Sequence, residues 1–225
     1  MTPNIHIGFL LFPNVTQLDL TGPAQILSRV PGAKTHLVWK RCEAVETDVR
    51  FSINPTVSFA DCPQLDVLCV PGGFGVGDMV LDEEVLAFLR GQAEGARYVA
   101  SVCNGALLLG AAGLLKGYRS ACHWMWRDYL HRFGAIPVAE RVVRDRNRIS
   151  GGGVTAGIDF GLTLAAELAG EEMAKVLQLA FEYDPQPPFD CGTPDKAGSE
   201  LVARLRAIQG ERLAQAEQKI FAVPV

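Results

Sequence analysis

The chain has 225 residues, of which 48% are hydrophobic and 20% are charged, and its formal net charge at pH 7 is −4. This composition is typical of a globular protein with a full core, and the length fits one α/β domain over residues 1–225. The negative charge gives no electrostatic basis for binding nucleic acid, and the apolar runs are too short and glycine-broken to span a membrane.

The cysteine count bears on redox state and metal binding. Six cysteines are present, which would allow three disulfides. A chain of this size with a full core does not need them, and we recognise no export signal, so we expect reduced thiols in a cytoplasmic protein. No Cys-x-x-Cys or His-x-x-x-His spacing occurs, so no metal site is expected.

The first half of the chain reads as strands separated by helices. An almost continuous apolar run at residues 5–12 predicts a strand buried on both faces. Thr21, Gly22 and Pro23 are typical of a helix start, so a helix is expected from there to about residue 30. Further strand-like segments are 35–39, 51–53, 56–59 and 65–70, the last of which runs into a glycine-rich loop at 71–77.

The second half continues this alternation. Asp82 is expected to cap a helix that extends to about residue 96, and a strand at 98–102 runs directly into a helix at 104–112. The remaining predicted elements are a strand at 119–123, a helix at 125–132, a hairpin of 141–143 with 148–150, and helices at 154–169, 171–183 and about 197–221. Such alternation favours a mainly parallel sheet sandwiched by helices. The final helix is open to two interpretations, part of the core or a dimer arm.

Cys103 stands where a strand meets a helix without a linker. Small residues, Ser101 and Gly105, lie two positions before and two after it. A sharp strand-to-helix turn needs small side chains at those positions, so the pattern predicts a nucleophile elbow with cysteine in place of serine. The helix N-terminus favours a thiolate, so we expect a lowered thiol pKa. The alternative is a buried packing cysteine.

Two further segments are candidates for the same sheet edge. Gly73, in a Pro-Gly-Gly turn after a buried strand, can bring its backbone N–H close to a ligand, and the Asn104 N–H can supply a second oxyanion donor. A plain tight turn explains the glycines equally well. Asp19, between two leucines, is either a helix cap or an acid beside the thiol with a raised pKa. His123 is the remaining candidate base.

Several segments of the chain resemble isonitrile (isocyanide) hydratases of the ThiJ/PfpI superfamily, and the similarity covers nearly the whole chain. The elbow and the Pro-Gly-Gly turn are shared widely in that superfamily. The Asp-Leu-Thr-Gly-Pro block at 19–23 and the glycine-rich helix entry at 151–159 narrow the resemblance to the hydratases and related regulators. The resembling segments are 8–13, 17–23, 71–73, 101–103, 110–115, 123–124 and 151–159.

The resemblance implies a flavodoxin-like sheet, a homodimer, and a cysteine nucleophile that works without a cofactor. It also implies that Asp19, rather than His123, exchanges protons with Cys103. The regulators carry an additional C-terminal helix-turn-helix unit, which we do not expect here. The sequence departs from the hydratases at Asn104 and Cys122, where they carry threonine, so we expect a pocket with a different substrate preference.

The expected activity is hydration of an isocyanide to an N-substituted formamide through a Cys103 thioimidate, with Asp19 as general acid and base. One rival is another enzyme of the superfamily, either glyoxalase-like or a peptidase. A peptidase favours histidine directly after the nucleophile, where this chain has Asn104. The other rival is a redox or ligand sensor without turnover. The sequence leaves open the R group of the substrate and the physiological role.

Overall fold

Seven strands form the central sheet of the computed structural model, which describes residues 4–224. In chain order, the strands of the described residues, inside and outside the central sheet, are β1 Ile5–Leu10, β2 Ala33–Trp39, β3 Val45–Glu46, β4 Ser52–Ile53, β5 Val57–Ser58, β6 Val67–Val70, β7 Tyr98–Val102, β8 Arg119–Ser120, β9 Ile136–Pro137, β10 Val142–Asp145 and β11 Arg148–Gly151. The central sheet has the order β10-β11-β7-β6-β1-β2-β5. All its neighbouring strands are parallel except β10 and β11, which form the predicted hairpin.

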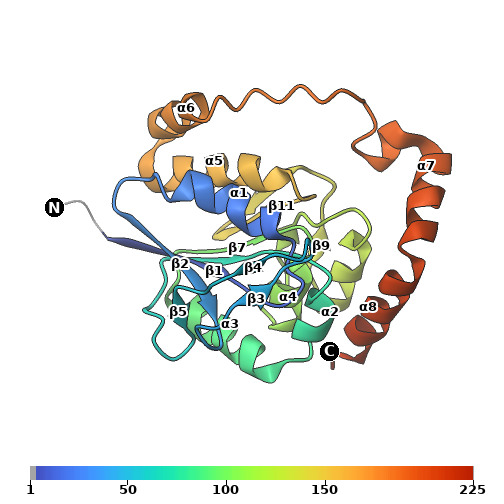
Figure 1. The fold of residues 1–225 in the computed structure, drawn as a ribbon, viewed down its shortest axis with the longest axis horizontal. Helices are drawn as coiled ribbons and strands as arrows, with labels where there is room; N and C mark the ends of the chain where they lie inside the picture. Colours follow the sequence, from blue (N-terminus) through green and yellow to red (C-terminus); the bar gives the residue numbers. More distant parts are fainter. Residues whose placement is uncertain (1–3, 225) are drawn as a thin grey trace.

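Helices cover both faces of this sheet (Figure 1). The helices are α1 Gln17–Leu27, α2 Val76–Met79, α3 Glu83–Gly95, α4 Gly105–Ala111, the 3-10 helix η1 Arg127–Phe133, α5 Ala156–Ala169, α6 Glu171–Ala180, α7 Pro194–Ile208 and α8 Gly210–Ala222. Helices α1 and α5 pack together on one face, and α3 and α4 pack against β6 on the other. The predicted flavodoxin-like fold, a mainly parallel sheet sandwiched by helices, is therefore confirmed.

The inner strands are apolar because no face of them meets water. All four residues of β6 are buried, and so are the last four of β7. Parallel strands covered on both faces need such continuous hydrophobic runs. Because β1, β6 and β7 run in the same direction, the loops that follow them meet at one edge of the sheet.

Helix α1 begins earlier than its sequence predicts. It starts at Gln17 rather than near Thr21, so Asp19 lies in its first turn and Pro23 lies inside it. The contact that lets this helix begin early comes from a segment distant in the sequence. Asp48, on a distant loop, accepts hydrogen bonds from Thr16 Oγ1 at 2.9 Å and from the Gln17 backbone N–H at 3.4 Å, and so caps the helix from outside.

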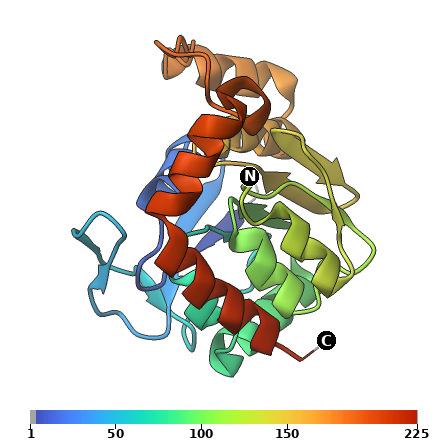
Figure 2. The same ribbon diagram turned by 90° about the vertical axis from the view of Figure 1, so that its right-hand side faces the viewer.

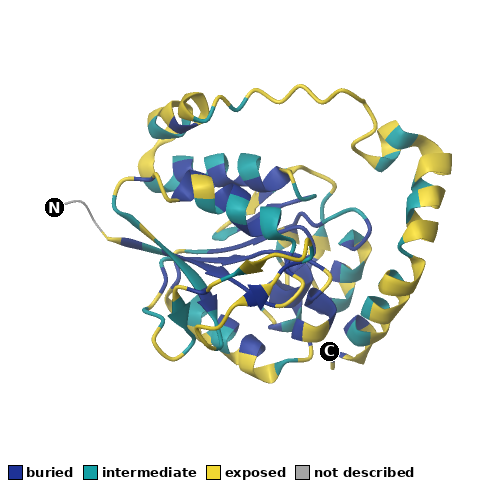
Figure 3. Ribbon diagram, viewed as in Figure 1, coloured by how far each residue is buried: buried dark blue, intermediate teal, exposed yellow. Residues whose placement is uncertain are grey.

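The C-terminal segment forms an arm that crosses the body of the protein (Figures 1 and 2). The predicted single helix at about 197–221 is instead two helices, α7 and α8, which meet at Gln209. The stretch between α6 and α7 is largely exposed, as are the outer faces of both arm helices (Figure 3). Helix α8 packs on α2, where Ile220 is 1% exposed. No helix within residues 4–224 has the length and apolar character needed to cross a bilayer.

Candidate active site

Cys103 stands at the apex of a strained turn between β7 and α4. Its φ of 60° lies in the left-handed region that residues with a side chain rarely adopt. The Cys103 backbone N–H donates to Gly151 O at 3.1 Å, which ties the apex to the end of β11. A Cβ at Gly105 would lie 2.3 Å from Val70 O, so only glycine fits there. The structure therefore has the elbow geometry that the small residues predict.

Asp19 reaches the same point from the first turn of α1. Its side chain is buried, and its Oδ2 accepts a hydrogen bond from the Gly72 N–H at 3.0 Å. A Cβ at Gly72 would lie 2.8 Å from both Asp19 Oδ2 and Cys103 Cβ, so the carboxylate and the cysteine face each other across this glycine. Burial raises the pKa of Asp19 to about 7, while the Gly72 N–H and the Cys103 thiol act to lower it.

The prediction of an acidic thiol is wrong for the resting protein. Burial, the charge of Asp19 and the nearby Cys122 together raise the pKa of Cys103 well above its usual value. The backbone N–H of Asn104, at the start of α4, acts in the opposite direction but is outweighed. Asp19 and Cys103 thus form a coupled pair in which the thiol keeps its proton near neutral pH.

Asn104 ties the elbow to the neighbouring glycine-rich turn. Its Oδ1 accepts from the Gly73 N–H at 2.8 Å, and its Nδ2 donates to Gly73 O at 3.1 Å. Gly73 has a φ of 142°, and a Cβ there would lie 2.4 Å from Asn14 O, so this turn requires glycine. The N–H that the sequence assigns to an oxyanion is consequently engaged by the Asn104 side chain in this structure.

A cavity of about 220 Å³ opens onto the cysteine. Its lining includes the predicted residues Cys103, Asn104 and Gly73 as well as His123. Burial lowers the pKa of His123 to about 4, so the imidazole is neutral near pH 7. The Met125 N–H points to its Nδ1 at 3.3 Å, which places the proton on Nε2. An imidazole with this low pKa, whose lone pair on Nδ1 already accepts from the Met125 N–H, is a weak base for deprotonating the thiol.

Sequence reasoning did not identify the remaining walls of this cavity, which are formed by Thr16, Asp48, Phe74, Met125, Trp126, Val154 and Gln209. Phe74 directly follows Gly73, so its place beside the glycine-rich turn could have identified it as a residue of this cavity. Asp48 and Gln209 lie in segments without a motif, and only the tertiary fold brings them to the cysteine. Within residues 4–224, no three His, Cys, Asp or Glu side chains cluster in a way that could hold a metal ion.

Comparison with known proteins agrees with this geometry. The DJ-1/PfpI family model matches residues 6–167, which include Asp19, Gly73, Cys103 and Asn104. The isonitrile hydratase of Pseudomonas putida is 56% identical over 93% of this chain and 92% of its own length. The transcriptional regulator GbdR of Pseudomonas aeruginosa is 30% identical over 79% of this chain, which spans only 50% of the regulator.

Solved structures show the same fold. A ThiJ/PfpI family protein from Pseudomonas syringae superposes with a TM-score of 0.93 at 43% identity, covering 97% of this chain and 91% of the other. DJ-1beta of Drosophila melanogaster superposes with a TM-score of 0.72 at 25% identity, covering 80% of this chain and 98% of the other. The chain therefore belongs to the DJ-1/PfpI family, in the branch that includes the isonitrile hydratase of Pseudomonas putida.

Proposed function

We propose that this protein is an isonitrile hydratase, which adds water to R–N≡C and releases the formamide R–NH–CHO. The observation that carries the proposal is the pairing of Cys103 with a buried carboxylate, Asp19, whose pKa of about 7 suits both proton uptake and proton release near neutral pH. The 56% identity to the Pseudomonas putida hydratase over most of both chains supports this chemistry.

In the first half of the proposed reaction, Cys103 Sγ attacks the terminal carbon of the isonitrile while its proton passes to Asp19. The new C–S bond leaves an electron pair on that carbon, and Asp19 returns the proton there to give the thioimidate R–N=CH–S–Cys. The Asn104 backbone N–H acts to favour the thiolate during attack. Asp19 is ionised again at the end of this half-reaction.

In the second half, Asp19 takes a proton from water as the hydroxyl adds to the thioimidate carbon, and the nitrogen receives that proton. Collapse of R–NH–CH(OH)–S–Cys breaks the C–S bond, and the hydroxyl proton returns to sulfur through Asp19. The products are the formamide and the free thiol, so the protein ends in its starting state. Gly73 contributes its N–H to the developing charge only if Asn104 releases it.

The direct test of activity is formation of N-cyclohexylformamide from cyclohexyl isocyanide by the purified protein. Product should appear with the native chain and be absent with Cys103→Ala at equal concentration. Unfolding midpoints of the two proteins confirm that both are folded. Absence of product with the native chain would contradict the proposed function.

We also propose that the protein is a cytoplasmic homodimer. All six cysteines, each within the described residues, are unpaired thiols, which suits a reducing compartment. Apolar side chains exposed on α6 and the linker after it, such as Leu179 at 83% and Phe189 at 75%, offer a surface for a second copy. Light scattering at micromolar concentration should give twice the chain mass, and a monomer mass would contradict the dimer.

A further inference from the structure

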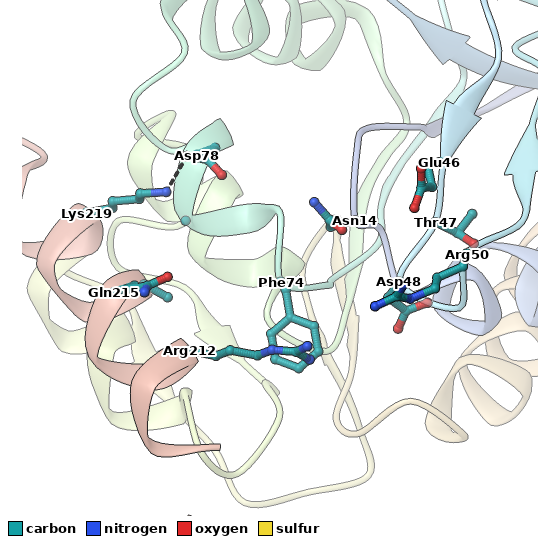
Figure 4. A pocket seen from close by; sticks show the side chains of 12 residues that line it. Asn14, Glu46, Thr47, Asp48, Arg50, Phe74, Asp78, Arg212, Gln215 and Lys219 are labelled. Atoms are coloured by element: carbon teal, nitrogen blue, oxygen red, sulfur yellow. Dashed lines mark hydrogen bonds and ion pairs between the residues drawn. The ribbon is translucent and has the colours of Figure 1, made fainter. Parts of the chain in front are cut away.

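A second and larger cavity, of about 430 Å³, adjoins the cysteine pocket (Figure 4). We call it the arm chamber, because helix α8 of the C-terminal arm forms one of its walls. The two cavities share Asp48 and Phe74. The two cavities therefore lie side by side at these two side chains, and the arm chamber is the neighbouring space for a group bound to Cys103 that is too long for its own pocket.

Two cations that line the arm chamber have no ion-pair partner among residues 4–224: Arg50 on the wall that carries Asp48, and Arg212 on α8. Only the second of these, Arg212, contacts an aromatic ring. Its guanidinium carbon lies 4.9 Å from the centre of the Phe74 ring, an arrangement that holds the side chain in place through a cation–π contact. Figure 4 shows it reaching across that ring. No carboxylate among residues 4–224 lies within 4.0 Å of it, whereas Lys219 on the same helix is paired with Asp78.

The opposite wall of the arm chamber carries Glu46, Asp48 and Arg50. The Asp48 carboxylate is already hydrogen-bonded to Thr16 Oγ1 and the Gln17 N–H, so its charge serves the start of α1. With these residues the lining is balanced in charge overall. On the α8 side, Arg212 is an unpaired cation that the contact with the Phe74 ring fixes at the boundary with the cysteine pocket, so this is the position that we assign to an anion.

We propose that the arm chamber holds the R group of the isonitrile and that Arg212 binds a carboxylate on it. This inference rests on the proposed hydratase function and names its substrate class: an isonitrile with a terminal carboxylate several bonds from the isocyano group. A planar guanidinium matches a carboxylate with two parallel hydrogen bonds. The matched family model ends at residue 167, so Arg212 belongs to an arm outside the family's common core.

The test compares two substrates that differ in charge and by one methyl group, an ω-isocyanopentanoate and its methyl ester. Native protein should hydrate the carboxylate with a kcat/KM about tenfold higher than the ester, as expected for one charge-assisted contact. Arg212→Met, which keeps the aliphatic stem, should lower the ratio of the two kcat/KM values from about ten to about one. Arg212→Lys keeps the positive charge but not the two parallel N–H donors of the guanidinium, so it should retain part of the preference for the carboxylate substrate.

The matched control is Arg204→Met on helix α7 of the same arm, where the arginine is exposed and does not line the arm chamber. It should keep the native preference. Equal loss in both methionine variants would show a general effect of removing positive charge from the arm and overturn the assignment, as would native protein that hydrates both substrates without preference. If native protein hydrates neither of these substrates nor cyclohexyl isocyanide, the proposed function itself fails, and the inference fails with it.

Discussion

Asp19→Asn should make the protein more stable at alkaline pH while it removes turnover. Asp19 is 1% exposed, and burial, the largest cause, raises its pKa from the ordinary 3.8 to about 7. A carboxyl whose pKa is higher in the folded state contributes stability that is fully present below the unfolded pKa. That contribution is lost as the pH rises from the unfolded pKa to the folded pKa, because the unfolded chain releases this proton in that range while the buried carboxyl of the native protein still holds it.

The size of the effect follows from the same shift. Each tenfold change in proton affinity corresponds to about 1.4 kcal/mol, so the rise from 3.8 to about 7 corresponds to about 4 kcal/mol. Asparagine does not ionise, and its carbonyl can still accept from the Gly72 N–H. Its amide, however, donates beside the Cys103 thiol, and an unsatisfied donor there costs about 1–3 kcal/mol at every pH.

The observable is therefore the difference in unfolding free energy between variant and native protein, measured in urea at pH 4 and at pH 8.5. That difference should move in favour of Asp19→Asn by about 3–4 kcal/mol between these pH values. Asp61→Asn, at an exposed aspartate, is the matched control and should show little movement. A difference in unfolding free energy that does not change with pH would refute the conclusion that burial makes ionisation of Asp19 unfavourable in the folded protein. Turnover of Asp19→Asn near the native rate would refute its role in proton transfer.

Other predictions concern the elbow and the pocket. Gly105→Ala should lower the free energy of unfolding by about 1–3 kcal/mol, since its Cβ would lie 2.3 Å from Val70 O. Gly91 lies on helix α3, and a Cβ added there would have no atom within 4 Å, so Gly91→Ala should raise the free energy of unfolding by up to about 1 kcal/mol. Equal effects in the two variants would contradict the steric clash expected at Gly105. Asn104→Thr cannot reproduce both bonds to Gly73, and it should raise kcat/KM for a bulky apolar isonitrile relative to a small one. An unchanged ratio would mean that Asn104 does not set the width of the pocket.

The features that the sequence predicts well are local or strongly patterned. Buried strands such as β6 are recognised by their continuous apolar runs, and Asp82 caps α3 as predicted, with the Val85 N–H at 3.3 Å from its carboxylate. The elbow follows from two small residues at fixed offsets from Cys103, and the structure shows why one of them must be glycine. These inferences need only neighbours along the chain.

The features that escape the sequence depend on distant contacts. Helix α1 starts early because Asp48 caps it from another loop, and no residue near Gln17 signals that partner. The acidity of Cys103 is misjudged because a helix N-terminus can be read from the chain, whereas burial and the Asp19 charge cannot. Arg212 lies more than a hundred residues beyond the elbow, and only the packing of α8 on α2 brings it to Phe74.

The central claim is that water adds to an isonitrile through a covalent bond to Cys103, and a rapid-quench experiment tests it most directly. Cyclohexyl isocyanide labelled with carbon-13 at the isocyano carbon is mixed with the protein, quenched at short times, and the digested peptides are analysed by mass spectrometry. The account predicts that the peptide containing Cys103 carries the whole labelled substrate. This adduct should form and decay at least as fast as formamide appears. Labelled formamide produced while the Cys103 peptide stays unmodified, or steady turnover by Cys103→Ala, would contradict the account.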